Sequence, residues 1–245
     1  MQTLRVLWRV AGVLVWVLWG WWRVQVIWRL TQRSTAQQAL DVQAWAKRML
    51  ALMGIDVRME GSPADGPVLL AANHISWLDI LVMHAAKHCR FVAKSEIRSW
   101  PLVGTLTTAG QSLYIERASN RDAVRVVHHM HEALQRGDVL AVFPEASTGD
   151  GTHLLPFHGN LLQAAISADA PIQPVALRFV QADTGLPSLA PCYVGDDTLV
   201  ASVWRTLGAP PLLAQVRYGT PEWAQGRSRR EWAHDLRSTI EHLLK

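Results

Sequence analysis

Val68-Leu-Leu-Ala-Ala-Asn-His-Ile-Ser-Trp-Leu-Asp79 joins a short apolar run to a polar segment and then to the start of a helical pattern. Its first five residues predict a buried strand at 68–72, and the residues that follow predict a helix over about 76–88. His74 therefore falls at the carboxyl end of a strand, and Asp79 falls in the first turn of a helix. This is the position at which α/β sheets bind their ligands.

The same alternation of short apolar runs and helical patterns continues on both sides of this stretch. Such alternation predicts an α/β fold with a mixed, largely parallel central sheet flanked by helices. No repeat or long linker interrupts it, so residues 54–245 are expected to form one domain. Further strands are expected at 55–59, 90–93, 112–115, 139–143, 172–179 and 212–218, and further helices from 101 and at 121–136, 160–167, 199–207 and 228–244.

The first 33 residues differ from the rest because they are apolar and rich in tryptophan. Six of the chain's 12 tryptophans lie within the first 28 positions, and residues 10–22 carry no charge. As a helix, residues 10–28 cover roughly 28 Å, against about 30 Å for a bilayer's hydrocarbon core. Aromatic and basic flanks are typical of a membrane interface. We therefore predict a hydrophobic membrane anchor at 1–33, which either spans the bilayer or lies in one leaflet.

Residues 34–53 carry apolar side chains at three- and four-residue steps, which predicts an amphipathic helix that ends at Gly54. At the other end of the chain, Ser228-x-x-Glu231 predicts a capping box at the start of the last helix. The N-terminal helical segment is thus expected to precede the α/β domain and to associate with the membrane.

Composition and motif searches exclude several classes of function. A net charge of +4 over 245 residues suits an anionic membrane surface but is too small to indicate nucleic-acid binding. Cys89 and Cys192 show no metal or redox spacing. The chain has no Gly-x-Ser-x-Gly elbow, no phosphate-binding loop and no His-Glu-x-x-His motif. The histidines at 128, 129 and 131 share no helix face, so a solvated surface is expected there and no metal site.

The pair His74 and Asp79 admits two interpretations on local grounds. Asp79 can hold the His74 imidazole as the orienting partner of a general base. Alternatively, Ser76-x-x-Asp79 is a capping-box-like pattern, and His74 is a hydrogen-bonded core histidine.

Four blocks of sequence, taken together, resemble those of a known family. Asn73-His74-x-Ser76-Trp77-x-Asp79 resembles the first motif of the 1-acylglycerol-3-phosphate acyltransferase family of glycerolipid and lysophospholipid acyltransferases. Gly110-Gln-Ser-Leu-Tyr-Ile-Glu-Arg117, Phe143-Pro-Glu-Ala-Ser-Thr148 and Ala170-Pro-Ile-Gln-Pro-Val175 resemble the second, third and fourth, in the family's order. Lys94 also matches the stretch between the first two motifs, and the resemblance extends over roughly 55–215.

This resemblance implies an O-acyltransferase that moves a fatty acyl group from acyl-CoA or acyl carrier protein to the free hydroxyl of a lysophospholipid. It makes His74 the general base and Asp79 the residue that fixes its tautomer. Arg117 would bind the acceptor's anionic head group, with Lys94 a weaker candidate. Glu145 would hydrogen-bond the acceptor or order the loop. No metal or redox cofactor is implied.

Two departures from the family pattern are visible in the motifs. Ala146 stands where the family has glycine, which is expected to alter the turn slightly, and Glu116 replaces the commoner aspartate. Thr148 stands where many members that use a phosphate monoester have arginine. The loop from Thr148 looks like the ornithine-lipid acyltransferase branch, whose acceptor carries an amine and a carboxylate that Asp150 and Arg117 can pair separately.

The first-ranked acceptor is 1-acylglycerol-3-phosphate (lysophosphatidic acid), giving phosphatidic acid in phospholipid biosynthesis, and lyso-ornithine lipid is the alternative. An alternative of another class is a catalytically inactive, membrane-anchored lipid-binding protein. A lipid hydrolase or transacylase would need Ser76 or Ser112 as its nucleophile. The expected location is the inner (cytoplasmic) membrane with the active site facing the cytoplasm, and the expected partners are membrane lipids and the acyl donor. The chain length of the donor and the oligomeric state are left open.

Overall fold

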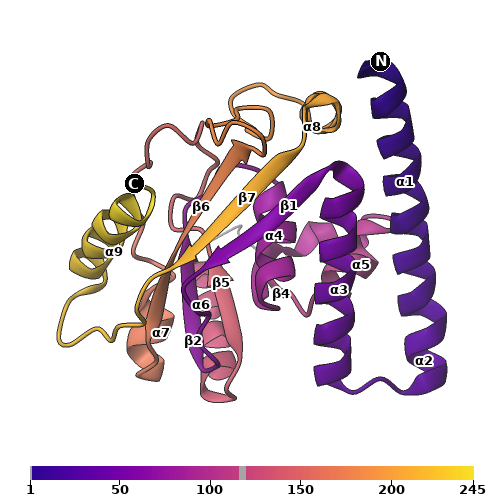
Figure 1. Ribbon diagram of the computed structural model, residues 1–245. Helices are drawn as coiled ribbons and strands as arrows, with labels where there is room; N and C mark the ends of the chain where they lie inside the picture. The colour runs from indigo at the N-terminus through magenta and orange to yellow at the C-terminus, as the bar shows by residue number, and fades with distance from the viewer. Residues whose placement is uncertain (1, 116–119) are drawn as a thin grey trace.

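A seven-stranded sheet forms the centre of the computed structural model, which describes residues 2–115 and 120–245 (Figure 1). The strands are β1 (Ile55–Glu60), β2 (Val68–Ala72), β3 (Arg90–Lys94), β4 (Leu113–Ile115), β5 (Val139–Val142), β6 (Ile172–Gln181) and β7 (Leu212–Tyr218). Their order across the sheet is β1-β7-β6-β2-β5-β3-β4. The predicted α/β fold is confirmed.

The sheet is mixed because one pair of neighbours is antiparallel. β6 and β7 run in opposite directions, whereas the other neighbouring pairs are parallel. The carboxyl ends of β2, β5 and β6 therefore meet at one edge of the sheet, and the segments that follow these strands converge there. This edge holds the residues that the sequence singled out.

Helices cover both faces of the sheet. The helices of the α/β domain are α4 (Leu78–Ala86), α5 (Val103–Ala109), α6 (Asn120–Gln135), α7 (Gln163–Ala168), α8 (Leu199–Gly208) and α9 (Arg229–Leu243). Alternate residues of β2 point to opposite faces: Leu70 packs with the α4 side and Leu69 with α6, α7 and α9. The predicted strands and helices are present with small shifts at their ends. A 3₁₀ helix at Ser95–Ser99 was not predicted.

Residues 2–53 form a helical hairpin beside the sheet (Figure 1). Its first arm is α1 (Gln2–Trp22), which continues through a π-helical turn (Arg23–Ile27) into α2 (Trp28–Thr31). The second arm, α3 (Thr35–Met53), begins with a capping box at Ser34 and ends at Gly54, whose φ is 78°. Gly54 is the predicted end of this helix.

Tryptophans join the two arms of the hairpin. The indole N–H of Trp16 donates to the Trp45 carbonyl at 3.1 Å, and the indole of Trp45 donates to the Trp16 carbonyl at 3.2 Å. Gly20 lies against Trp45, where an added Cβ would stand 2.4 Å from the indole nitrogen. The close approach of the arms therefore requires glycine at position 20.

The two long faces of α1 have opposite surroundings. The inner face packs on the α/β domain: Val6 is buried, and Arg9 donates to the carbonyls of Leu207 at 2.9 Å and Ala209 at 2.8 Å, at the C-terminal end of α8. Within the described residues, Thr3–Thr31 is the one helix long and apolar enough to cross a membrane, by length and composition only. The exposed large apolar residues of α1 are Leu4, Leu7, Trp8, Leu14, Val15, Leu18, Trp21 and Trp22.

Candidate active site

The connection between β2 and α4 brings His74 and Asp79 together. His74 Nδ1 lies 2.8 Å from Asp79 Oδ2, and the same oxygen accepts the backbone N–H groups of Ile75 at 2.6 Å and Ser76 at 2.9 Å. An ionised carboxylate oxygen can only accept, so Nδ1 of His74 donates to an Asp79 carboxylate in this contact. The other ring nitrogen, Nε2, then carries the lone pair. His74 is partly exposed, and Asp79 is fully buried.

The capping interpretation and the base–orienter interpretation describe the same carboxylate. Asp79 accepts backbone N–H groups at the start of α4, and the Ser76 hydroxyl accepts the N–H of Leu78 at 3.2 Å. Capping therefore positions the oxygen that contacts His74. Ser76 is 0% exposed, so its hydroxyl is closed to substrate. Ser112 lines a different, apolar cavity.

Two neighbouring strands hold the His74 segment in place. The ring of Phe143, directly after β5, stacks on the His74 imidazole with centroids 4.0 Å apart and an angle of 9° between the planes. The Asn73 side chain donates to the Leu177 carbonyl at 3.0 Å and accepts the Leu177 N–H at 2.7 Å. Phe143 thus fixes the His74 imidazole from the end of β5, and Asn73 ties the neighbouring backbone to β6.

Glu145 ties the loop after β5 to His74. One carboxylate oxygen accepts the His74 N–H at 2.7 Å, and the other accepts the Leu155 N–H at 2.8 Å. Burial raises the pKa of Glu145, and these two backbone hydrogen bonds act in the opposite direction. Because both oxygens are used, the geometry fits loop ordering, one of the two roles expected for this residue.

The turn after Glu145 holds Ala146 in a strained backbone conformation. Its φ is 60°, in the left-handed region that favours glycine, and its N–H donates to the Phe143 carbonyl at 3.1 Å. The backbone therefore keeps the conformation a glycine would adopt, at a steric cost of about 1–2 kcal/mol. The hydrogen bonds of Glu145 on either side hold the strained residue in place.

A pocket of about 310 Å³ opens at His74. Two further acidic residues, Glu145 and Asp150, line it, as does Arg178 of β6. Asp150 accepts the backbone N–H of Thr152 at 2.9 Å and its hydroxyl at 2.7 Å. These hydrogen bonds lower the pKa of Asp150, so the pocket carries a carboxylate near its opening.

Of the other residues expected at the head group, Thr148 can be placed. Thr148 is absent from its lining, because its hydroxyl donates to the Tyr193 carbonyl and ties two loops together. This argues against direct head-group binding by Thr148. Lys94 is the last residue of β3. Arg117 lies outside the described residues, so its expected role remains a prediction.

Arg178 is a pocket residue that sequence reasoning missed. A signal was available, because Arg178 is the one charged residue of β6 and lies toward the carboxyl end of that mostly apolar strand. Its place in the His74 pocket depends on the pairing of β6 with β2. These two strands lie far apart in the sequence, and their pairing was not predicted.

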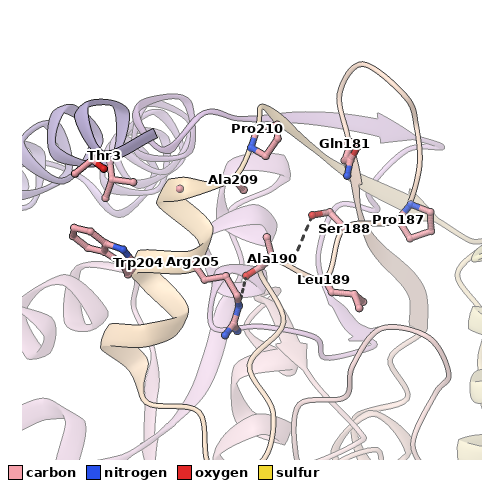
Figure 2. Close-up of a pocket in the computed structure, with 12 residues that line it drawn as sticks. Thr3, Gln181, Pro187, Ser188, Leu189, Ala190, Trp204, Arg205, Ala209 and Pro210 are labelled. Atoms are coloured by element: carbon pink, nitrogen blue, oxygen red, sulfur yellow. Dashed lines mark hydrogen bonds between the residues drawn. The ribbon is translucent and has the colours of Figure 1, made fainter. Parts of the chain in front are cut away.

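Two further hollows lie near the pocket. An apolar cavity of about 300 Å³ is enclosed by the N-terminal hairpin, α4 and α5, with Trp45, Leu81, His84 and Leu106 in its wall. A larger hollow of about 490 Å³ lies between α1, α8 and the segment after β6 (Figure 2). Pro187, Ser188 and Leu189 line both this hollow and the catalytic pocket.

The larger hollow offers no free arginine. Arg205 in its wall donates to the Ala190 carbonyl at 3.1 Å (Figure 2) and pairs with Asp197 at 2.8 Å. His128, in the histidine cluster of α6, is exposed and lies 3.2 Å from Glu132.

The comparisons with known proteins agree with this geometry. A family model described as Acyltransferase matches residues 54–178, slightly more than half of the chain. The chain belongs to the acyltransferase family. This confirms the family predicted from the four sequence blocks, and the protein is an acyltransferase by membership.

Individual relatives of this acyltransferase include two named enzymes. It is 33% identical over 200 residues to the lyso-ornithine lipid O-acyltransferase of Pseudomonas aeruginosa, covering 82% of this chain and 76% of that protein. It is 40% identical over 172 residues to the 1-acyl-sn-glycerol-3-phosphate acyltransferase of Neisseria gonorrhoeae, covering 69% and 67%. The crystal structure of PlsC, the 1-acyl-sn-glycerophosphate acyltransferase of Thermotoga maritima, matches with a TM-score of 0.72 at 19% identity, covering 100% of this chain and 96% of that one. At that identity the match shows the shared fold.

Proposed function

We propose that this acyltransferase moves a fatty acyl group from acyl-CoA or acyl carrier protein to the free hydroxyl of 1-acylglycerol-3-phosphate, giving phosphatidic acid. The observation that carries the proposal is the 2.8 Å contact between His74 Nδ1 and Asp79 Oδ2, which leaves Nε2 facing a pocket without a described partner. A thioester carbonyl is already activated. The protein must therefore supply a base and an orientation, and needs no nucleophile of its own.

In the proposed reaction, the acceptor oxygen bonds to the thioester carbonyl carbon while its proton passes to Nε2 of His74. The buried Asp79 carboxylate stabilises the imidazolium that forms. The carbon–sulfur bond then breaks, and the leaving thiolate takes the proton back from Nε2. The products are the ester and the free thiol, and His74 returns to its starting state.

The surroundings of the site suit substrates that reside in a bilayer. The apolar cavity beside α4 has a lining suited to part of an acyl chain. The outer face of α1 exposes apolar residues along its length, while its inner face is packed on the α/β domain. A helix covered by protein on one side fits the headgroup region of one leaflet better than a full crossing. The proposed location is the cytoplasmic face of the inner membrane, where thioester donors are made.

Lyso-ornithine lipid is the second candidate acceptor. The observation in its favour is that Asp150 and Arg178 line the same pocket, because a carboxylate beside an arginine suits an acceptor that carries both an amine and a carboxylate. The 33% identity to a lyso-ornithine lipid O-acyltransferase points the same way. The 40% identity to an enzyme named for 1-acyl-sn-glycerol-3-phosphate supports the first candidate.

The test offers purified full-length protein equal concentrations of both acceptors in vesicles, once with acyl-CoA and once with acyl carrier protein, and measures thiol release and the lipid product. A preference for 1-acylglycerol-3-phosphate supports that lipid as the acceptor, and a clear preference for lyso-ornithine lipid reverses the order of the two candidates. Lipid binding without thiol release under any pairing would favour the inactive lipid-binding alternative. Protection of a C-terminal tag from protease added to inverted vesicles would contradict the cytoplasmic orientation.

A further inference from the structure

Arg178 is the only arginine or lysine among the described residues that line the catalytic pocket. It follows Leu177, whose backbone N–H and carbonyl are both bonded to the Asn73 side chain. Because Asn73 precedes His74, the pairing of β2 with β6 places Arg178 beside the general base. The two residues come from sequence positions more than 100 apart.

The guanidinium of Arg178 is only partly used by the protein. Nη1 donates to the Leu244 carbonyl at 3.2 Å, and this is its one hydrogen bond within the described residues. It forms no ion pair with any described residue, including Asp150 in the same pocket. An arginine has five N–H donors, and a half-buried one without a counter-ion is a ready anion site.

Arg178 also has a structural role at the end of α9. Donation to Leu244 places a cation at the C-terminal end of α9, where the helix dipole favours positive charge. Arg217 makes the same kind of contact from β7, with Nη1 2.8 Å from the Leu243 carbonyl, and it is also paired with Glu60. Arg217 does not line the pocket. Capping of α9 therefore explains one N–H group of Arg178 but not its exposure to the substrate side.

We propose that Arg178 binds the anionic group of the acceptor's head group and thereby holds the free hydroxyl at Nε2 of His74. The ligand chemistry is a phosphate monoester or a carboxylate, since the planar guanidinium can bind two oxygens of either at once. Where the acceptor also carries an ammonium, Asp150 is the oppositely charged group in the same pocket. This inference rests on the proposed acyl transfer to a lysolipid.

The test compares Arg178→Gln and Arg178→Lys with Arg217→Gln, all in the full-length protein. Arg217 is the matched control because it contacts the same end of α9 from outside the pocket. Loss of a charged hydrogen-bonding partner is expected to raise KM for the acceptor about 10- to 100-fold in Arg178→Gln, with a smaller change in kcat and none in KM for the donor. Arg178→Lys should recover part of the loss, and Arg217→Gln should stay within twofold of wild type.

Separate arms with 1-acylglycerol-3-phosphate and lyso-ornithine lipid identify the anion, because the acceptor that wild type uses should show the larger KM change. An acceptor KM within twofold of wild type in both arms would overturn the assignment, as would an equal effect of Arg217→Gln. Binding titrations with glycerol 3-phosphate and with a short-chain N-acyl-ornithine test anion binding by Arg178 without turnover. They therefore distinguish failure of this inference from failure of the proposed function. Even if wild type acylated neither lipid, unchanged binding of both soluble anions by Arg178→Gln would sink the inference, and at least tenfold weaker binding of one would support it.

Discussion

The His74 pocket and the apolar cavity are built on different principles. At the pocket, hydrogen bonds join specific atoms: Oδ2 of Asp79 contacts His74, and the two oxygens of Glu145 accept one backbone N–H group each. In the cavity, Trp45, Leu81 and Leu106 enclose a volume and leave few polar atoms to bond. The start of α4 bears on both, because Asp79 contacts His74 in the pocket wall and Leu81 lines the cavity.

This contrast sets what each region tolerates. A pocket held by hydrogen bonds depends on the identity of single atoms, since an unpaired buried polar group is costly. A cavity formed by packing depends on total volume, and similar apolar residues exchange with modest effects. Substitutions that break the hydrogen bonds of His74 should therefore sharply lower turnover, whereas substitutions in the cavity should change which chain is accepted or how stable the protein is.

The largest effect is expected from His74→Ala. Loss of a general base should lower the rate of acyl transfer by roughly 10²–10⁴-fold while folding and membrane binding are retained. Asp79→Asn should also be severely impaired, because an amide favours the wrong imidazole tautomer. Thiol release measures both. His128→Ala, at an exposed histidine of α6, is the control, and more than a tenth of wild-type rate in His74→Ala would refute the assignment.

Filling the cavity tests the other half of the contrast. Leu106→Trp adds volume to the cavity wall, and overpacking of this kind costs about 1–3 kcal/mol when a ligand has to be accommodated. We expect about a tenfold lower rate with a long-chain acyl donor and little change with a short-chain donor. Equal losses with both donors would show that the cavity does not receive the acyl chain.

The outer face of α1 is the proposed contact with the bilayer. The double variant Leu14→Glu, Leu18→Glu is expected to bind vesicles at least tenfold more weakly than wild type. Each substitution removes an apolar side chain and adds a charge. Val124→Glu, at an equally exposed apolar residue of α6, is the matched control. Co-sedimentation with vesicles measures the effect, and unchanged binding of the double variant would place the membrane contact elsewhere.

His84 is a titratable group in the apolar cavity, and it makes folding sensitive to acid. Burial, with a smaller contribution from His88, lowers the pKa of His84 to about 3. As pH falls below 6.5, the unfolded chain takes up the proton before the folded protein does, so stability present above pH 6.5 is lost. The loss should reach roughly 3 kcal/mol by pH 4.5.

Urea unfolding in detergent at pH 7 and pH 4.5 measures this loss, and His84→Leu should reduce it. The raised pKa of Glu145 acts in the opposite direction, since protonation there favours the folded state. That contribution cancels in the difference between wild type and His84→Leu. An identical acid dependence in the two proteins would contradict a buried neutral His84.

The smallest effect is expected at Ala146, in the hydrogen-bonded loop. Ala146→Gly should raise the free energy of unfolding by about 1 kcal/mol, because glycine adopts the φ of 60° without the steric cost. Turnover should stay near wild type, since the Glu145 hydrogen bonds already hold this conformation. A marked loss of activity in Ala146→Gly would mean that the Cβ itself contributes to the site.

Local pattern was sufficient for the elements and for the centre of the site. Strand β2 begins and ends where it was predicted, and Gly54 ends α3 as expected. His74 and Asp79 meet because a strand end followed by the first turn of a helix brings residues five apart within hydrogen-bond distance. The capping residues at Ser228 and Glu231 could be predicted for the same reason. Contacts between near neighbours follow from local conformation, which the sequence encodes directly.

The remaining contacts depended on the packing of the whole sheet. The antiparallel pairing of β6 with β7, the placement of Arg178 beside His74 and the turning of Thr148 toward Tyr193 join segments that lie far apart in the chain. Sequence periodicity does not predict such contacts, because each depends on how all strands and helices bury their apolar surfaces together. The sequence by itself therefore determined the elements, the family and the contact between His74 and Asp79. Only the tertiary structure decided which charged residues surround that pair, because long-range contacts are chosen by global packing and not by local conformation.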